Sequence, residues 1–189
     1  MSSRVKHPTI LITGGSGFIG RNLLERLPKN YNLLAPTHKD LELLDEKAVE
    51  RYFRKNSFDV VIYSSNIGGT RNTTHLSNVA LTNLRIFFNI LRCKKMYGRM
   101  IFLGSGAEYN KNRPLRKIKE NDFDKIVPSD EYGFYKYVCS KLIGETDNII
   151  NLRLFGVYGK YEDKNMRFIS NALYRNILGL PIIINQNVI

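Results

Sequence analysis

The feature that most constrains the fold is a glycine-rich turn near the N-terminus. An apolar run, Thr9–Thr13, leads into Gly14-Gly15-Ser16-Gly17-Phe18-Ile19-Gly20, and residues 18–27 then have helical spacing. Such a run is typical of a buried parallel strand, and glycines allow a tight turn and close packing of a helix on that strand. The helix start offers free N–H groups and a positive dipole end to an anion. Strand, turn and helix together predict a pyrophosphate site for a dinucleotide, formed by Gly14, Gly17, Phe18, Ile19 and Gly20.

The rest of the chain alternates between strand-like and helical spacing. We expect strands at residues 31–35, 60–63, 100–103 and 149–154, and helices at 46–54, 79–97, 132–147 and 168–180. Such alternation implies right-handed crossovers and a parallel sheet with helices on both faces. The predicted fold is therefore α/β, a doubly wound parallel sheet of the Rossmann type. Residues 1–180 would form the NAD(P)-binding domain, and residues 181–184 would begin one more strand, opening a second domain at 181–189.

Composition and charge argue against several other classes of protein. The chain has no 18-residue apolar stretch and no segment like a signal peptide, so we expect no membrane span and a cytoplasmic location. Its 29 Lys and Arg residues give a net charge of +12 but are scattered, which favours an ordinary basic protein over a nucleic-acid binder. Cys93 and Cys139 lack metal-like spacing, so we expect neither a metal site nor a disulfide.

The residues after the second expected strand bear on the choice between NADP and NAD. An acidic side chain there bonds the ribose 2′-hydroxyl of NAD, whereas a basic one accommodates the 2′-phosphate of NADP. Here the strand is followed by His38 and Lys39, with no carboxylate before Asp40. This pattern favours NADP as the cofactor, with NAD as the alternative. The two basic residues could also belong to an ordinary solvated loop.

A tyrosine and a lysine four residues apart supply candidate chemistry. Tyr132 and Lys136 fall in one expected helix, so their side chains would share a face. A nearby ammonium would lower the pKa of the phenol, and it could also bond the ribose hydroxyls of a cofactor. Ser105 ends a neighbouring strand, and its hydroxyl could hold a substrate carbonyl beside the tyrosine. The same spacing recurs at Tyr137 and Lys141, about 140° around the helix, so the spacing alone does not choose between the pairs.

These motifs occur in the order seen in the extended short-chain dehydrogenases/reductases, the family of nucleotide-sugar epimerases, dehydratases and reductases. The resemblance rests on residues 13–20, 103–105, 132–136 and 153–159 and covers nearly the whole chain. Within the family, the chain is most similar to GDP-L-fucose synthases. The resemblance selects Tyr132 and Lys136 over the second pair, and it implies that Ser105, Tyr132 and Lys136 are the catalytic residues.

The same resemblance implies further contacts with the cofactor. Asp45 would approach the adenine, Ser64 and Ser65 with Asn66 would line the cofactor, and Lys136 would also bind it. Asn83 would brace the site from its helix, unless it is an ordinary exposed helix residue. The resemblance also implies a homodimer formed through two helices, one of which carries Tyr132.

Departures from the family pattern narrow the expected reaction. GDP-L-fucose synthases carry an epimerising cysteine two residues after the serine and a later histidine, but here the first position is Ala107 and residues 165–168 contain no histidine. Dehydratases carry acidic residues just after the Ser/Thr, where this chain has Gly106 and Ala107. Glu108 comes one position too late, and we interpret it as a loop carboxylate rather than a catalyst.

We therefore expect an NAD(P)-dependent oxidoreductase that reduces a nucleotide-activated 4-keto-sugar. One alternative is a nucleotide-sugar 4-epimerase, or a dehydratase, with tightly bound NAD. The other is a non-catalytic, dinucleotide-binding regulatory protein. Members of the family continue into a smaller substrate domain, which we expect to be largely missing from this chain.

Overall fold

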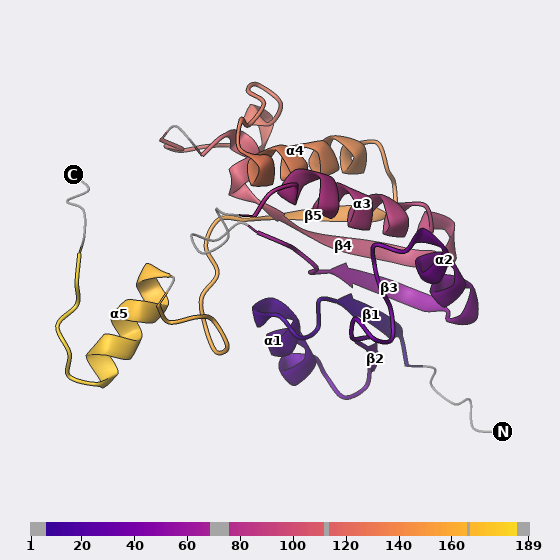
Figure 1. Ribbon diagram of the computed structural model, residues 1–189, viewed down its shortest axis with the longest axis horizontal. Helices are drawn as coiled ribbons and strands as arrows, with labels where there is room; N and C mark the ends of the chain where they lie inside the picture. The colour runs from indigo at the N-terminus through magenta and orange to yellow at the C-terminus, as the bar shows by residue number, and fades with distance from the viewer. Residues whose placement is uncertain (1–6, 69–75, 112–113, 166, 185–189) are drawn as a thin grey trace.

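Five parallel strands form one sheet in the described part of this chain. The computed structural model describes residues 7–68, 76–111, 114–165 and 167–184 (Figure 1). The sheet has the order β2-β1-β3-β4-β5, with strands β1 Thr9–Thr13, β2 Asn32–Leu34, β3 Phe58–Tyr63, β4 Tyr97–Ser105 and β5 Ile149–Leu154. The helices are α1 Phe18–Arg26, α2 Glu46–Lys55, α3 Val79–Leu91, α4 Glu131–Gly144 and α5 Phe168–Ile177, with 3-10 turns η2 Lys94–Met96, η3 Gly106–Tyr109 and η4 Glu120–Asp122. The predicted doubly wound parallel sheet is confirmed.

The strand order fixes where a ligand can bind. β1 lies between β2 and β3. After β1, the chain therefore adds β2 at one edge of β1 and then adds β3 at the other edge. In register, Thr13 of β1 lies beside Tyr63 of β3, and Ser105 of β4 lies beside Leu154 of β5. The carboxyl ends of these four strands therefore form one edge. In open α/β sheets, ligands bind outside this edge, where the strand order reverses.

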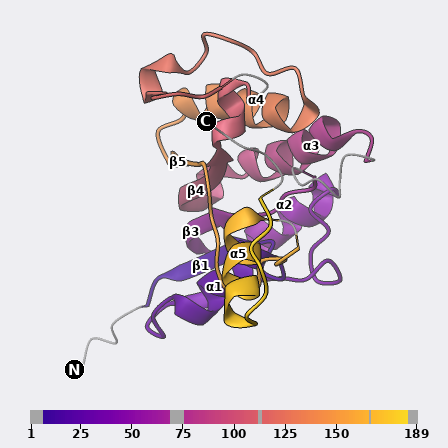
Figure 2. The same ribbon diagram turned by 90° about the vertical axis from the view of Figure 1, so that its left-hand side faces the viewer.

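The two faces of the sheet are covered by different helices. Leu11, Val61 and Phe102 belong to a large core that includes buried side chains of α2, α3 and α4. Ile10 and Ile12 point to the opposite face and pack with residues of α1. Figure 2 shows α2, α3 and α4 together along one side of the strands and α1 alone near β1. The alternation of apolar side chains along β1 thus buries both faces, as expected for a central parallel strand.

The face covered by α1 is only partly closed. Ile150 and Leu152 of β5 remain 42% and 43% exposed on the side of the sheet away from α4. α5 has no buried residue, and Figure 1 shows it apart from the sheet. Ile177, near its end, is 80% exposed. The described part of the chain therefore leaves apolar surface open beside β5 and on α5.

One predicted helix is shorter than expected, and one predicted strand lacks a partner among the described residues. The helix predicted for residues 79–97 ends at Leu91, and Tyr97 instead begins β4, paired with Phe58. Tyr97 is buried, and its ring lies 5.9 Å from that of Phe53 on α2, so packing overrides the helical spacing. Residues 181–184, predicted to begin one more strand without a partner in this sequence, pair with no strand in the described part of the chain. The remainder of that predicted second domain lies outside the described residues.

Other sequence-based expectations concern the class of protein. Among the described residues, no helix is both long and apolar enough to cross a membrane. Cys93 and Cys139 are buried free thiols. Within the same described ranges, no three His, Cys, Asp or Glu side chains gather in a way that could hold a metal ion.

Candidate functional site

The glycine turn between β1 and α1 has the geometry that the sequence predicted. Gly14 has a φ of +68°, and a Cβ atom there would lie 2.9 Å from the carbonyl oxygen of Ser64. The N–H of Gly17 donates to the carbonyl of Gly14 at 3.0 Å and closes the turn. A Cβ atom on Gly20 would lie only 2.2 Å from the same carbonyl. Gly14 is thus packed too closely against Ser64, and Gly20 too closely against the turn, for a side chain at either position.

The start of α1 is suited to an anionic group. Gly17 is the N-cap and gives the helix no side-chain hydrogen bond, and no acidic residue occupies the first turn. The first N–H groups of a helix need partners, and the helix dipole favours negative charge there. A second observation points to a ligand: the buried Ser65 Oγ has no hydrogen-bond partner among the described residues. The residues present therefore fit a dinucleotide bound through its pyrophosphate at α1.

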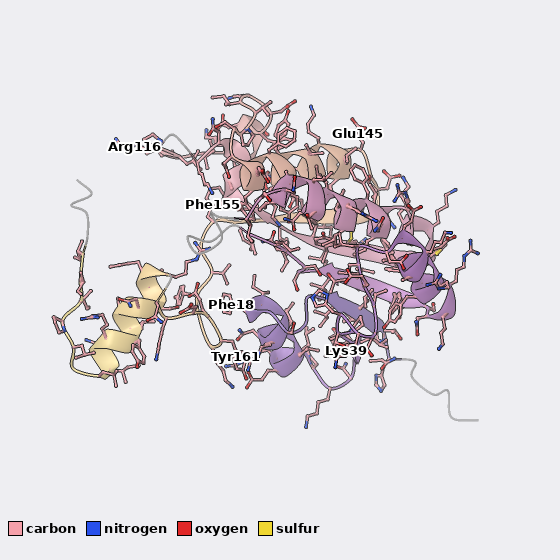
Figure 3. The ribbon with its side chains drawn as sticks, viewed as in Figure 1. Phe18, Lys39, Arg116, Glu145, Phe155 and Tyr161 are labelled. Atoms are coloured by element: carbon pink, nitrogen blue, oxygen red, sulfur yellow. The ribbon has the colours of Figure 1, made fainter. Side chains whose placement is uncertain are left out.

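A cavity of about 830 Å³ lies at the carboxyl edge of the sheet. This volume falls in the usual range for small-molecule and cofactor sites. In Figure 3, the labelled Phe18, Phe155 and Tyr161 lie on the side of the body that faces α5. The lining comes from the start of α1, the ends of β3, β4 and β5, η3 and the loop after it, the first turns of α4, and the segments before and in α5: Phe18, Ile19, Ser64, Ser65, Asn66, Leu103, Gly104, Ser105, Gly106, Ala107, Lys111, Leu115, Tyr132, Lys136, Leu154, Phe155, Gly156, Val157, Tyr158, Tyr161, Glu162, Asp163, Arg167, Phe168 and Ile169.

The three predicted catalytic residues meet on the wall of this cavity. Ser105 ends β4, and its Oγ accepts a hydrogen bond from the N–H of Ala107 at 3.2 Å. Lys136 is 3% exposed, its Nζ donates to the carbonyl of Leu103 at 2.6 Å, and it lies 5.8 Å from the centre of the Tyr132 ring. Burial lowers the pKa of Lys136 to about 8. The lysine is therefore still mostly an ammonium at neutral pH.

The electrostatics of Tyr132 differ from the expectation. We expected the Lys136 ammonium to lower the pKa of this phenol, but burial raises it, and a hydrogen bond with Ser105 and the charge of Arg167 offset only part of that effect. Desolvation wins because the phenolate would lose its water in a largely apolar wall. Tyr132 thus keeps its proton at neutral pH. A group in this state can donate a proton to a bound substrate.

The second pair with the same spacing lies elsewhere. The Tyr137 hydroxyl donates to the Asp124 carboxylate, and Lys141 Nζ donates to the same carboxylate at 2.6 Å. Asp124 and Lys141 are exposed, and neither member of this pair lines the cavity. Of the two candidate pairs, only Tyr132 and Lys136 face the cavity.

The segment after β3 holds further predicted contacts. Ser64 Oγ donates to the carbonyl of Thr13 at 2.5 Å, so it joins the ends of β1 and β3. Asn83 is fully buried, not exposed: its Oδ1 accepts from the N–H of Ile67 at 2.9 Å, and its Nδ2 donates to the Ile67 carbonyl at 2.7 Å. The Tyr135 hydroxyl donates to Asn66 Oδ1 at 2.8 Å. α3 and α4 thus fix one wall of the cavity, although Asn83 itself does not line it.

The remaining predicted cofactor residues, like Gly14, Gly17 and Gly20, are not among those that line the cavity. The His38 side chain is 86% exposed and has Glu42 as its neighbour, with Nδ1 and Oε2 3.7 Å apart. Lys39 is also exposed, and Figure 3 shows it away from Phe18 and Phe155. Asp45 is the N-cap of α2, where its Oδ1 accepts from the N–H of Ala48 at 3.0 Å. Their roles toward a cofactor stay predictions.

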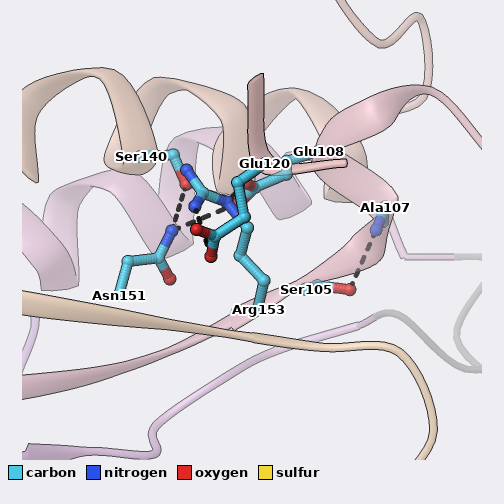
Figure 4. Close-up of polar contacts among 7 residues, drawn as sticks. All are labelled: Ser105, Ala107, Glu108, Glu120, Ser140, Asn151 and Arg153. Carbon is cyan, nitrogen blue, oxygen red and sulfur yellow. Dashed lines mark hydrogen bonds and ion pairs between the residues drawn. The ribbon is translucent and has the colours of Figure 1, made fainter. Parts of the chain in front are cut away.

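Sequence reasoning missed a buried ionic group behind the cavity. Glu108, interpreted as a loop carboxylate, is fully buried in η3 and paired with Arg153 of β5 (Figure 4). The available signal was Arg153 in an apolar strand, because a charge at such a place requires a partner of opposite sign. Arg167 and Lys111 were also missed, and both line the cavity.

Comparison with known proteins identifies the family. Residues 10–188 match the model described as the NAD dependent epimerase/dehydratase family. GDP-L-colitose synthase of Yersinia pseudotuberculosis is 26% identical over 187 residues, which cover 90% of this chain and 61% of that protein. GDP-L-fucose synthase of Azorhizobium caulinodans is 40% identical over 65 residues, covering 34% of this chain and 21% of that protein.

A solved structure shows the same fold. MlghC, a GDP-mannoheptose C4 reductase from Campylobacter jejuni with NADP bound, superposes with a TM-score of 0.77 at 24% identity, covering 91% of this chain and 58% of that one. This chain thus spans less than two thirds of the length of each of these proteins. The family is described as NAD-dependent, which agrees with the predicted class of cofactor. The chain belongs to the NAD-dependent epimerase/dehydratase family, as the order of its motifs predicted.

Proposed function

We propose that this chain forms the cofactor-binding and catalytic part of an NADP(H)-dependent reductase of nucleotide-activated 4-keto-sugars. The observation that carries the proposal is the single cavity shared by the start of α1, Ser105, Tyr132 and Lys136. Similar proteins named as GDP-sugar synthases and a GDP-sugar C4 reductase support a GDP-sugar as the substrate class. The NADP bound to the C4 reductase, with His38 and Lys39 after β2, supports NADP as the cofactor.

The residues around the cavity would take separate roles in the reduction of a carbonyl group. When bound, a reduced nicotinamide supplies the hydride for the carbonyl carbon. Ser105 Oγ would donate a hydrogen bond to the carbonyl oxygen, and Tyr132 would give that oxygen its proton, so that the ketone becomes an alcohol. The Lys136 ammonium would hold cofactor ribose hydroxyls close to the Tyr132 ring. Ser64, Ser65 and the α1 N-terminus would bind and orient the rest of the cofactor.

The protonation states suit the reductive direction. Burial raises the pKa of Tyr132, so the phenol carries the proton that reduction consumes. After transfer, the phenolate lies near the ammonium of Lys136, and opposite charges in a site of low polarity attract strongly. Proton donation is thus favoured by the groups around Tyr132, and the phenol can be restored from water.

Simple reduction is supported over epimerisation at C3 and C5. Ala107 lines the cavity and is 7% exposed, where GDP-L-fucose synthases carry a cysteine. Arg167 lines the cavity from the segment in which those synthases carry a histidine, and an arginine is effectively always protonated and cannot act as a base.

The second candidate is a nucleotide-sugar 4-epimerase, because Ser105, Tyr132 and Lys136 also suffice to oxidise and re-reduce C4. NAD retained through purification would favour the epimerase, and exchangeable NADP the reductase.

Removal of the phenol tests the proposal. We expect Tyr132→Phe in the full-length protein to lower turnover of a GDP-4-keto-sugar with NADPH by about 10²- to 10⁴-fold, the usual contribution of a general acid. Tyr137→Phe is the matched control, since it removes a hydroxyl five residues away that donates to Asp124 outside the cavity. Equal turnover by the wild type and Tyr132→Phe, measured as loss of NADPH absorbance, would sink the proposal.

A further inference from the structure

Behind the cavity, one buried carboxylate joins three elements of the fold. Glu108 of η3 accepts a hydrogen bond from Ser140 Oγ of α4 at 2.5 Å and pairs with the Arg153 guanidinium of β5 (Figure 4). Asn151 of β5 donates to Ser140 Oγ at 2.6 Å and to Glu108 at 3.4 Å. Every partner comes from a different helix or strand than Glu108 itself. The carboxylate therefore ties η3 to both α4 and β5.

This group lies directly behind the proposed catalytic residues. Ser105 caps η3 by accepting from the N–H of Ala107, and Glu108 follows within the same short turn. Ser140 lies four residues after Lys136, so both lie on the buried face of α4. η3 also packs on the first turn of α4, where a Cβ atom on Gly133 would lie 2.9 Å from the carbonyl of Ala107. A change at Glu108 would act on the arrangement of Ser105 and Lys136 together.

We propose that Glu108 is a positioning residue for the reduction proposed above: it holds the turn after Ser105 against α4 and places its carboxylate behind Lys136. It is not among the described residues that line the cavity. Its carboxylate points away from the cavity, into the core. Its role is thus exerted through Lys136 and through the turn after Ser105.

The groups around Lys136 explain why this charge matters. From β4 it meets the carbonyl of Leu103 and the ring of Phe102, and from α4 the rings of Tyr132 and Tyr135 and the thiol of Cys139. Burial raises the pKa of Cys139 and of Tyr135, so both stay neutral at neutral pH.

Of the described groups that shift the pKa of Lys136, Glu108 is thus the one that forms an ion pair, with Arg153. Burial of Lys136 is the larger effect and brings its pKa down to about 8, while Cys139 and Glu108 act in the opposite direction. Without the Glu108 charge, the pKa would fall further. At neutral pH a larger fraction of Lys136 would then be an uncharged amine.

Titration of the lysine side chains tests this inference without cofactor or substrate. Lysine labelled with 13C at Cε reports each amine by NMR, and Lys136→Arg assigns the signal. We expect Lys136 to titrate near pH 8 in the wild type and at least about half a unit lower in Glu108→Gln. Glu120→Gln is the control, because Glu120 also pairs with Arg153, at 3.6 Å, but its side chain is 86% exposed. An unchanged Lys136 midpoint in folded Glu108→Gln would overturn the inference.

A second variant covers the case in which Glu108→Gln does not fold. Removing one partner of a buried ion pair leaves an uncompensated charge, whereas replacing both is often tolerated. Glu108→Gln combined with Arg153→Met removes both charges, and Arg153 is not among the groups that shift Lys136. The same lowered midpoint is expected in this double variant. A midpoint equal to the wild type's would again contradict the inference.

The pH dependence of NADPH affinity separates this inference from the proposed function. If the Lys136 ammonium binds cofactor, affinity falls as pH rises through the Lys136 midpoint, and in Glu108→Gln this fall starts at a correspondingly lower pH. A lowered midpoint without any change in NADPH affinity would support the positioning role of Glu108. It would count against the cofactor role of Lys136 in the proposed function.

Discussion

Replacement of Lys136 by methionine is expected to change how the stability of the fold depends on pH. Lys136 is 3% exposed, and burial lowers its pKa from the ordinary 10.5 to about 8. In the unfolded chain the amine regains its ordinary pKa, so between these two values the unfolded state binds the proton more tightly. Unfolding therefore takes up a proton in this window, and the free energy of unfolding rises with pH there.

The magnitude follows from the difference between the two pKa values. One unit corresponds to about 1.4 kcal/mol, so the shift from 10.5 to about 8 corresponds to about 3 kcal/mol. This stability is fully present above the unfolded pKa and is lost as pH falls through the folded pKa. Below pH 8 the protein bears the full cost of a buried ammonium. The Lys136→Met variant carries no titrating group at this position, so it lacks this contribution at every pH.

Urea unfolding from about pH 7 to about 10.5 measures the effect as a difference between wild type and variant. The difference removes the contributions of Tyr63 and Tyr135, whose raised pKa values affect both proteins equally at high pH. We expect the stability of the wild type relative to Lys136→Met to rise by about 3 kcal/mol across this range. Lys141→Met is the control, because Lys141 is exposed and bonded to Asp124, and no such rise is expected. A relative stability that does not change with pH would refute this account of Lys136.

Three further changes test separate parts of the structure. Gly20→Ala would place a Cβ atom 2.2 Å from the Gly14 carbonyl and lower the free energy of unfolding by about 1–3 kcal/mol. Gly144→Ala is the control, because open space surrounds that position, and no such loss is expected. Equal urea midpoints for the two variants would contradict the close packing at Gly20. Asp45→Ala would remove the N-cap hydrogen bond of α2 and lower the free energy of unfolding by about 1 kcal/mol. Asp45→Asn would retain the cap and the stability. An equal loss of stability in both variants would count against capping by Asp45. Lys39→Glu would lower the preference for NADPH over NADH by about tenfold in fluorescence titrations, and an unchanged ratio would count against NADP selection by this loop.

Local features of the fold could be predicted from the sequence. The turn at residues 14–20 is specified by its own glycines, which the observed φ of Gly14 and the contact at Gly20 require. The end of α3 could not be predicted in the same way, because apolar spacing continues beyond Leu91. Only pairing of Tyr97 with Phe58 on β3 places that residue in a strand. Contacts between distant residues thus decide this boundary.

The residues of the candidate site could be predicted from the sequence, but the environment of their side chains could not. Ser105, Tyr132 and Lys136 follow from motifs, and they line one cavity. The raised pKa of Tyr132 was not predictable, because it depends on how deeply the folded chain buries the ring. Glu108 was misread for a related reason: its partner Arg153 is 45 residues away, and the sequence does not show that both side chains point to the same side of the sheet.

Binding of NADPH to the purified chain tests the central claim most directly. We expect calorimetric titration to show one saturable site per chain, because the glycine turn, the free N-terminus of α1 and the Ser65 hydroxyl, which has no partner among the described residues, fit a dinucleotide. Gly14→Val should weaken binding by at least about tenfold, since its side chain would meet Ser64 and its φ favours glycine. Absence of saturable binding by the folded chain, or equal affinity in Gly14→Val, would contradict the claim.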